Sequence, residues 1–240
     1  MEDEELMESP PPSPDEVARR AIILSVVSCR GIVDGDRANS TPARQLAKSS
    51  YDWLVSLGLE EELSGWERQV LTSPFGSLAK QDRINASWLS EAVIVLAWSL
   101  EKTELPGFEK QCDPADAANS LGFLRSADST VLSTPHLRPL EDLREYNGFI
   151  YNLHWRVRDF SLNGRSYDFE SLARKAWGDP ILRHGLVLQD GDLSVGGVPI
   201  SRAEEGTWRK LVSITRERHR ASNWLIGYAS KDFYEITTDT

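Results

Sequence analysis

Hydrophobic residues recur along most of the chain at intervals of three and four positions, which is the spacing of an amphipathic helix. The longest such segment is residues 82–101 (DRINASWLSEAVIVLAWSLE), for which the pattern predicts one continuous central helix. From Ala92 to Leu100 this segment is apolar nearly all round, as is typical of a helix enclosed by its neighbours. The apolar run is too short to cross a membrane. We therefore expect it to form the centre of the core.

The same spacing, together with capping and breaking residues, predicts further helices on both sides of the central segment. Asp15 is expected to cap the first of them, and Thr41 followed by Pro42 begins the second. Ser64 and Glu67 have the spacing of a capping box. The expected helices cover residues 15–29, 41–57, 64–71, 113–125, 139–162, 167–177 and 203–227.

Only residues 186–200 change to a period of two, which is the spacing of β-strands. Two turn dipeptides, at residues 190–191 and 196–197, divide this segment. Short strands are expected at Leu186–Gln189, Asp192–Val195 and Val198–Ile200. The predicted fold is therefore mainly α, a single multi-helix domain over residues 17–240 that carries one small β-hairpin or meander near residues 186–200.

The net charge of −10 is concentrated at the N-terminus. Residues 1–16 contain seven acidic residues, no basic residue and several prolines, and this composition predicts a disordered acidic tail. The remaining residues are only mildly acidic, which argues against binding to nucleic acid or to an anionic membrane surface. The chain opens without the charged and apolar regions of a secretory signal, so a cytoplasmic protein is expected.

Charged residues fall on the apolar faces of three predicted helices. Glu91 lies in the middle of the apolar face of the central helix. Arg218 lies on the stripe of the last helix, and Arg158 on that of helix 139–162. Because an unpaired buried charge costs several kcal/mol, the favoured interpretation is a buried network that pairs Glu91 with Arg218, or with Arg158 in its place. A functional pocket, or arginines that reach solvent, are the alternatives.

Motifs for metal, cofactor or nucleophilic chemistry are not found in the sequence. The four histidines share no metal-ligand spacing, and neither a P-loop nor a GxSxG motif is present, so no metal and no cofactor is expected. Cys29 and Cys112 form no CxxC pair; two buried thiols are the favoured interpretation and one disulfide the alternative. The basic run at residues 216–220 is expected to be a solvated helix face.

Three segments of the chain form a recognisable set. Residues 88–100 have the pattern W-x-x-E-A…L-x-W-x-L, and residues 152–158 contain H-W-x-x-R. Residues 217–240 have the pattern E-R-x-x-A-x-N-W-L…D-T. Together they resemble the DUF4272 family, whose members are found mostly in bacteria and have no assigned function. The resemblance extends over roughly residues 17–240 and implies a single helical domain of bacterial origin without indicating a reaction. Such endings usually carry a tryptophan where this chain has Phe233.

Two functional hypotheses remain open. The first is a cytoplasmic, non-catalytic binding or interaction protein with an unidentified protein partner, such as a basic protein that the acidic tail would attract. The second is a hydrolase or transferase of unknown substrate, built in a cleft around four polar residues. With Arg218 these form the candidate polar cluster Glu91, His154, Arg158, Arg218 and His219. Convergence of Glu91 and His154 on open space would favour the enzyme.

Overall fold

The computed structural model describes residues 9–35, 40–176 and 186–239. Within these ranges the fold is mainly α with one small antiparallel sheet, as the sequence pattern predicts. The chain divides into two compact units, each described separately. Of the described residues, 13–35, 40–105 and 112–137 form the α1–α6 unit, and 9–12, 106–111, 138–176 and 186–239 form the α7–α10 unit. The expected single domain over residues 17–240 stays a prediction.

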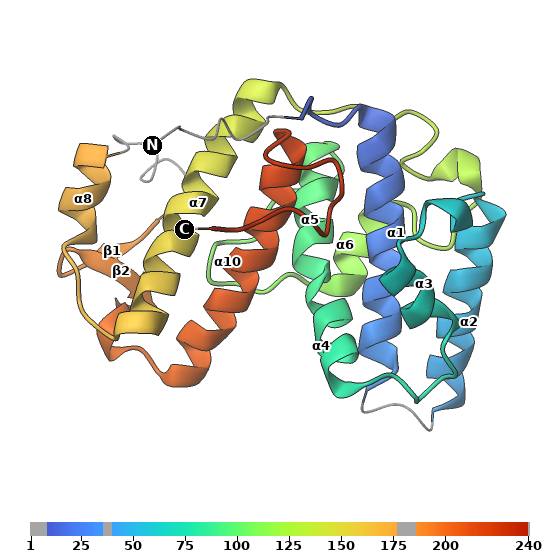
Figure 1. The fold of residues 1–240 in the computed structure, drawn as a ribbon, viewed down its shortest axis with the longest axis horizontal. Helices are drawn as coiled ribbons and strands as arrows, with labels where there is room; N and C mark the ends of the chain where they lie inside the picture. The colour runs from blue at the N-terminus through green and yellow to red at the C-terminus, as the bar shows by residue number, and fades with distance from the viewer. Residues whose placement is uncertain (1–8, 36–39, 177–185, 240) are drawn as a thin grey trace, which may run out of the picture. The chain divides into compact units, whose positions relative to one another are not determined.

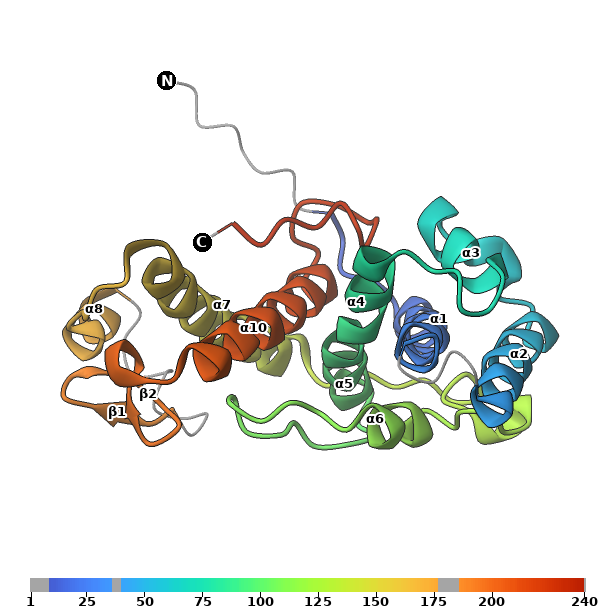
Figure 2. The ribbon, with the colours of Figure 1, turned by 90° about the horizontal axis from the view of Figure 1, so that it is seen from below.

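The α1–α6 unit is built around its first helix. Its helices are α1 (Pro14–Val33), α2 (Thr41–Ser56), α3 (Gly65–Thr72), α4 (Lys80–Trp88), α5 (Ser90–Ser99) and α6 (Pro114–Ser120). Helix α1 packs against each of the other five, and Figure 2 shows it nearly end-on among them. Its residues from Val17 to Val27 are largely buried, as an apolar run at helical spacing requires.

The predicted central helix is interrupted, so the prediction of one continuous helix over residues 82–101 is wrong. Helix α4 ends at Trp88, α5 begins at Ser90, and the two follow one another through Leu89 (Figure 1). The amide of Leu89 donates to the carbonyl of Ala86 at 3.2 Å, a tight three-residue turn. The freed carbonyl of Ser87 accepts from the hydroxyls of Ser90 and Ser28, at 3.1 and 3.4 Å. Two buried serines, one on α1 and one on α5, thus supply hydrogen bonds to the carbonyl of Ser87 at the break.

Helices α1 and α4 approach closely at Gly31. A β-carbon on Gly31 would lie 2.6 Å from the Cβ of Ala86 and 2.7 Å from the amide nitrogen of Ser87. Glycine therefore permits the contact between the two helices, immediately before the turn at Leu89. The sequence alone gives no reason for a glycine inside a helix, where it costs about 1 kcal/mol relative to alanine.

Helix starts are in part as predicted. The capping box of Ser64 and Glu67 is confirmed, and Asp113 caps α6. The expected cap at Asp15 is wrong, because Ser13 caps α1 in a capping box with Glu16. The predicted boundary of the tail at residue 16 is corrected accordingly, since residues 13–16 form the start of α1. Residues 1–8 lie outside the described part of the chain. In the same way Ser40, rather than the expected residue Thr41, caps α2.

The α7–α10 unit pairs two long helices beside a small sheet. Helix α7 (Leu140–Asn163) packs against α10 (Glu205–Leu225), as Figure 1 shows. Between them in sequence come α8 (Phe169–Ala176), β1 (Leu188–Gln189), β2 (Asp192–Val195) and β3 (Val198–Pro199). The strands form an antiparallel meander in the order β1-β2-β3, which confirms the predicted hairpins. The predicted end of helix 167–177 at Trp177 lies outside the described residues.

Strand ends differ from the prediction by one or two residues. The first strand begins at Leu188 instead of Leu186, and the third ends at Pro199, after which Ile200 begins a turn of 3₁₀ helix. No helix in the described ranges is long and apolar enough to cross a membrane.

The two helical glycines Gly31 and Gly148 should respond in opposite directions to alanine. Gly31→Ala should lower the free energy of unfolding by about 1–3 kcal/mol, because the new methyl group overlaps Ala86 and the α4 backbone. Gly148→Ala, in α7, meets nothing within 4 Å and should raise it by about 0.5–1 kcal/mol through helix propensity. Urea unfolding of both variants measures the two changes in the free energy of unfolding. Equal changes would contradict the close approach at Gly31.

Candidate functional site

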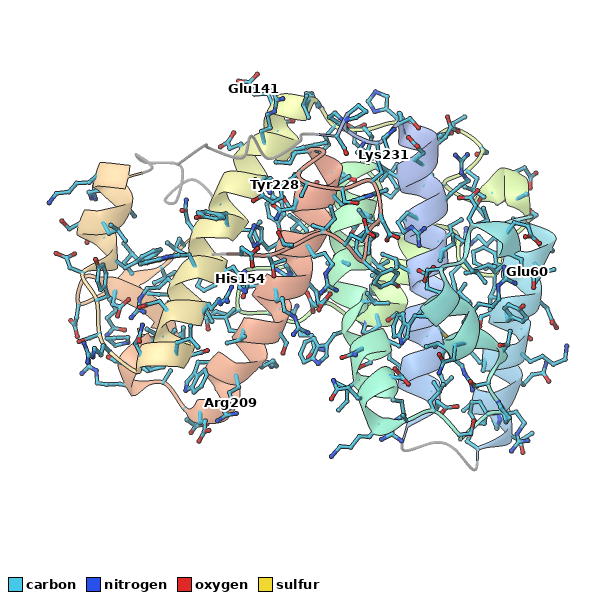
Figure 3. All side chains as sticks on the ribbon, viewed as in Figure 1. Glu60, Glu141, His154, Arg209, Tyr228 and Lys231 are labelled. Atoms are coloured by element: carbon cyan, nitrogen blue, oxygen red, sulfur yellow. The ribbon has the colours of Figure 1, made fainter. Side chains whose placement is uncertain are left out.

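Two histidines of the candidate polar cluster lie side by side in the α7–α10 unit. His154 of α7, labelled in Figure 3, and His219 of α10 face each other with their Nδ1 atoms 3.0 Å apart. The rings meet edge to face, and Tyr151 packs edge-on against His219. A hydrogen bond between two Nδ1 atoms requires one ring to donate and the other to accept, so the pair holds opposite tautomers.

Burial keeps this histidine pair uncharged. It lowers the pKa of His154 to about 3, and the positive charges of His219, Arg158 and Arg216 lower it further. Burial also lowers the pKa of His219 to about 4, against which a hydrogen bond to Asn223 acts weakly. Both rings are therefore neutral at neutral pH. A histidine with so low a pKa is a weak base, since a general base works best with a pKa near the operating pH.

Arg218 and Arg158 belong to the same unit. Arg218 is 2 % exposed and donates to the carbonyls of Lys110 at 2.8 Å and Pro106 at 3.3 Å, so it holds the segment 106–111. Arg158 is half-buried and close enough to His154 to depress its pKa.

Glu91 is fully buried in the α1–α6 unit, where its Oε1 accepts from the backbone amide of Cys112 at 2.9 Å. The pairing of Glu91 with Arg218 or Arg158 stays a prediction. Cys29, which is half-buried, and Cys112, which is buried, form no disulfide in the part of the chain that the structure describes.

The sequence interpretation missed a buried ion pair between Arg156 and Asp192. Arg156 is 0 % exposed, and its Nε and Nη2 donate to the two carboxylate oxygens of Asp192, each at 2.7 Å. Its remaining donors reach Asp159 and the carbonyl of Arg165. Asp192 also accepts from the amides of Tyr167 and Leu193. The pair thereby joins α7, the start of α8 and the sheet. A basic residue inside H-W-x-x-R was its only sequence signal.

A hollow of about 620 Å³ adjoins this ion pair and is lined by acidic residues. Asp190 pairs with Arg202, Asp192 with Arg156, and Asp168 accepts from the amide of Ser171 at the start of α8. These carboxylates are thus already engaged within the protein. No group of three or more histidine, cysteine, aspartate or glutamate side chains in the described ranges could hold a metal ion.

A more enclosed cleft lies in the α1–α6 unit, between α1, α2, α5 and α6. We call it the apolar cleft; its volume is about 460 Å³, and none of its lining residues is charged at neutral pH. Cys29 lies in its wall, and burial raises the pKa of this thiol to about 11, so the sulfur is protonated. Ile32, Leu46 and Leu124 stand at its edge and are 41, 36 and 40 % exposed. Leu124 also has a φ of 59°, a strained conformation for a leucine.

The comparison with protein families gives one clear result. A family model described as a domain of unknown function, DUF4272, matches residues 2–174. The chain belongs to the DUF4272 family. Comparisons with curated proteins and with solved structures found no match. Residues 217–240, which carry the last of the three resembling segments, lie outside this match. Phe233 is buried edge-on against Trp224, with ring centroids 5.9 Å apart.

Acid should destabilise the protein through the histidine pair. Unfolded histidines titrate near 6.5, so the stability of the neutral pair is fully present above that pH and is lost as the pH falls toward the folded pKa values of about 4 and 3. When the pH falls from about 7 to 5, each of the two histidines should lower the free energy of unfolding by roughly 2 kcal/mol. His154→Gln should remove about half of this loss, whereas His136→Gln, at an exposed position, should not. Urea unfolding at both pH values tests this, and an unchanged pH dependence in His154→Gln would contradict it.

The buried ion pair gives a matched test in one hairpin. Asp192→Asn should lower the free energy of unfolding by about 3–5 kcal/mol, because it leaves the Arg156 charge buried without its carboxylate. Asp190→Asn removes the exposed partner of Arg202 and should cost less than about 1 kcal/mol. Equal losses in thermal or urea unfolding would show that the Arg156 pair contributes no more than a surface pair.

Proposed function

We propose that this DUF4272 protein is a non-catalytic, cytoplasmic binding protein that holds an uncharged, largely apolar small molecule in the apolar cleft. The observation that carries the proposal is the cleft itself. Its volume of about 460 Å³ lies within the range of about 300–1,000 Å³ found for small-molecule sites. Three exposed aliphatic side chains, Ile32, Leu46 and Leu124, line this one hollow, and apolar residues gathered at a concave surface are typical of ligand sites.

The polar groups in the wall indicate what kind of ligand fits. The hydroxyl of Ser25 donates to the carbonyl of Ile22 at 2.7 Å, and those of Ser28 and Ser90 donate to the carbonyl of Ser87. Their protons are therefore already donated to backbone carbonyls of the protein itself. Asn119, exposed on α6, offers an amide at the edge. A charged ligand would lose its hydration without gaining a partner, which is costly. An uncharged ligand with few polar atoms suits this lining.

The chemistry of the cleft and of the histidine pair favours binding over catalysis. A thiol with a pKa of about 11 is a poor nucleophile, since the thiolate is the reactive form. His154 engages His219 through Nδ1 and has too low a pKa to serve as an efficient base at neutral pH. The hydrolase or transferase hypothesis therefore gains no support from these groups. A basic protein partner for the acidic N-terminal residues stays a hypothesis.

The neutral fluorophore prodan tests the cleft directly. We expect saturable binding, seen as a blue shift and gain in emission as the dye enters an apolar site. Ala115→Trp places an indole at the rim and should weaken binding at least about tenfold, the equivalent of about 1.4 kcal/mol. Ala127→Trp, at an exposed position outside the cleft, is the matched control and should bind as the unaltered protein does. Circular dichroism verifies that both variants fold.

Equal affinity in the two tryptophan variants would show that the dye binds elsewhere and would contradict the proposal. Absence of saturable binding to the unaltered protein would contradict it as well.

A further inference from the structure

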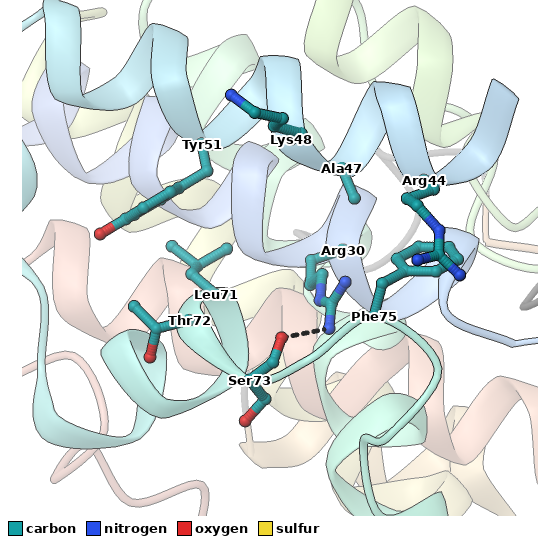
Figure 4. A pocket seen from close by; sticks show the side chains of 9 residues that line it. All are labelled: Arg30, Arg44, Ala47, Lys48, Tyr51, Leu71, Thr72, Ser73 and Phe75. Carbon is teal, nitrogen blue, oxygen red and sulfur yellow. Dashed lines mark hydrogen bonds between the residues drawn. The ribbon is translucent and has the colours of Figure 1, made fainter. Parts of the chain in front are cut away.

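A second hollow in the α1–α6 unit has the opposite chemistry. We call it the basic pocket; it lies between α1, α2 and the end of α3 and has a volume of about 310 Å³ (Figure 4). Three cationic side chains, Arg30, Arg44 and Lys48, line it together with Phe75 and Tyr51. No carboxylate is among the lining residues. The pocket and the apolar cleft share no lining residue, although both use α1 and α2.

Arg30 forms the fixed floor of the basic pocket. It is 4 % exposed, and its guanidinium donates to the carbonyls of Val70, Ser73 and Pro74, at 2.9–3.3 Å. It therefore caps the carbonyl end of α3 from a neighbouring helix. Its charge is balanced by Asp34 at 3.1 Å. The Cζ atom of Arg30 also lies 5.1 Å from the centre of the Phe75 ring, which helps to fix that ring in the wall.

Arg44 and Lys48 are the exposed cations of the lining. They are four positions apart on α2, so they lie on the same side of the helix, where like charges repel. Arg44 is exposed and lies over the Phe75 ring, with its Cζ atom 5.5 Å from the ring centre. Arg44 forms no ion pair with any residue in the ranges that the structure describes. Lys48 pairs with Asp52 at 2.5 Å, but both side chains are more than half exposed, so this pair is weak and exchangeable.

The acidic residues nearest to the pocket are committed elsewhere. Asp34 accepts from the amides of Gly76 and Leu78 as well as pairing with Arg30. Glu60 accepts from the hydroxyl of Tyr51 at 2.7 Å and pairs with Arg68. These bonds hold the carboxylates outside the hollow. An anion that enters would therefore meet Arg44, which has no ion pair among the described residues, and Lys48, whose exposed pair with Asp52 can exchange. None of the residues that line the pocket carries a carboxylate.

We propose that the basic pocket binds a small molecule that carries one phosphate or carboxylate group beside a planar or apolar part. The guanidinium of Arg44 is suited to bidentate recognition of either oxyanion, and stacking on Phe75 holds it in place. Lys48 adds a mobile second charge. Leu71 and the rings of Phe75 and Tyr51 provide the surface for the remainder of the ligand. Occupation of this pocket is independent of the apolar cleft, because the linings are separate.

Isothermal titration with phenyl phosphate at low salt tests the pocket. We expect binding in the millimolar range or tighter, weakened at least about tenfold in Arg44→Gln and less in Lys48→Gln, since charge-assisted hydrogen bonds are lost. Arg125→Gln and Lys102→Gln remove the same charges at exposed positions outside the pocket and should bind phenyl phosphate as the unaltered protein does. Arg44 is exposed, so its replacement should leave the melting temperature nearly unchanged.

Three further ligands identify what is recognised. Benzoate replaces the phosphate group, and whichever of the two binds more tightly identifies the preferred oxyanion. Inorganic phosphate should bind more weakly than phenyl phosphate, because it lacks the ring. Benzyl alcohol, which has the ring without the charge, should not bind measurably.

The proposal is overturned if neither phenyl phosphate nor benzoate binds at millimolar concentration, or if benzyl alcohol binds as well as they do. It is also overturned if Arg44→Gln and Arg125→Gln bind phenyl phosphate equally, since the attraction would then be a general effect of charge. Prodan binding should be unchanged in Arg44→Gln, and phenyl phosphate binding unchanged in Ala115→Trp. Failure at one pocket is thus distinguishable from failure at the other.

Discussion

Buried guanidinium groups constrain much of this structure, because each must find several acceptors away from water. Arg30 binds three carbonyls at the end of α3, Arg156 binds Asp192 and the carbonyl of Arg165, and Arg218 binds the carbonyls of Pro106 and Lys110. In each case a side chain on a long helix fixes a segment that is distant in sequence or has left its helix. In this way the arginines donate hydrogen bonds to backbone carbonyls that lie outside regular helices or at their ends. The end of α3, the carbonyl of Arg165 and the segment 106–111 are thereby tied to long helices.

The close packing of α1 determines where the two pockets of the α1–α6 unit form. On one side, Gly31 brings α1 against α4, and the serines that satisfy the break at Leu89 also line the apolar cleft. On the other side, Arg30 draws the end of α3 toward α1 and makes the floor of the basic pocket. A small apolar cluster of Val33, Ala43 and Ala47 lies between α1 and α2, packed against Cys29 of one wall and Phe75 of the other. Small side chains on α2 thus keep the two hollows near each other.

The proposed binding role rests on how the polar groups around the cavities are arranged. The hydroxyl protons of Ser25, Ser28 and Ser90 in the apolar cleft are used by the protein itself, and the buried histidines His154 and His219 bind each other. A catalytic group must instead be available to a substrate with a pKa near the operating pH. Exposed groups at these cavities include the aliphatic rim of the apolar cleft and the cations of the basic pocket. Both are suited to recognition of a ligand.

Most helices, the strands and some capping residues could be predicted from the sequence, because their decisive hydrogen bonds link residues that are close together in the chain. The capping box of Ser64 and Glu67 and the turn at residues 190–191 are examples. The break at Leu89 could not be predicted, since its support comes from Ser28 on another helix. Nor could the contact of His154 with His219 or of Arg156 with Asp192. The partners in these two contacts are 65 and 36 positions apart in the chain. Many polar residues could have paired with each of them, and only the packing of α7 against α10 and the sheet decides which ones do. The two pockets could not be predicted either, because each is formed by side chains from several helices. The pattern of hydrophobic residues along the chain does not say how those helices pack.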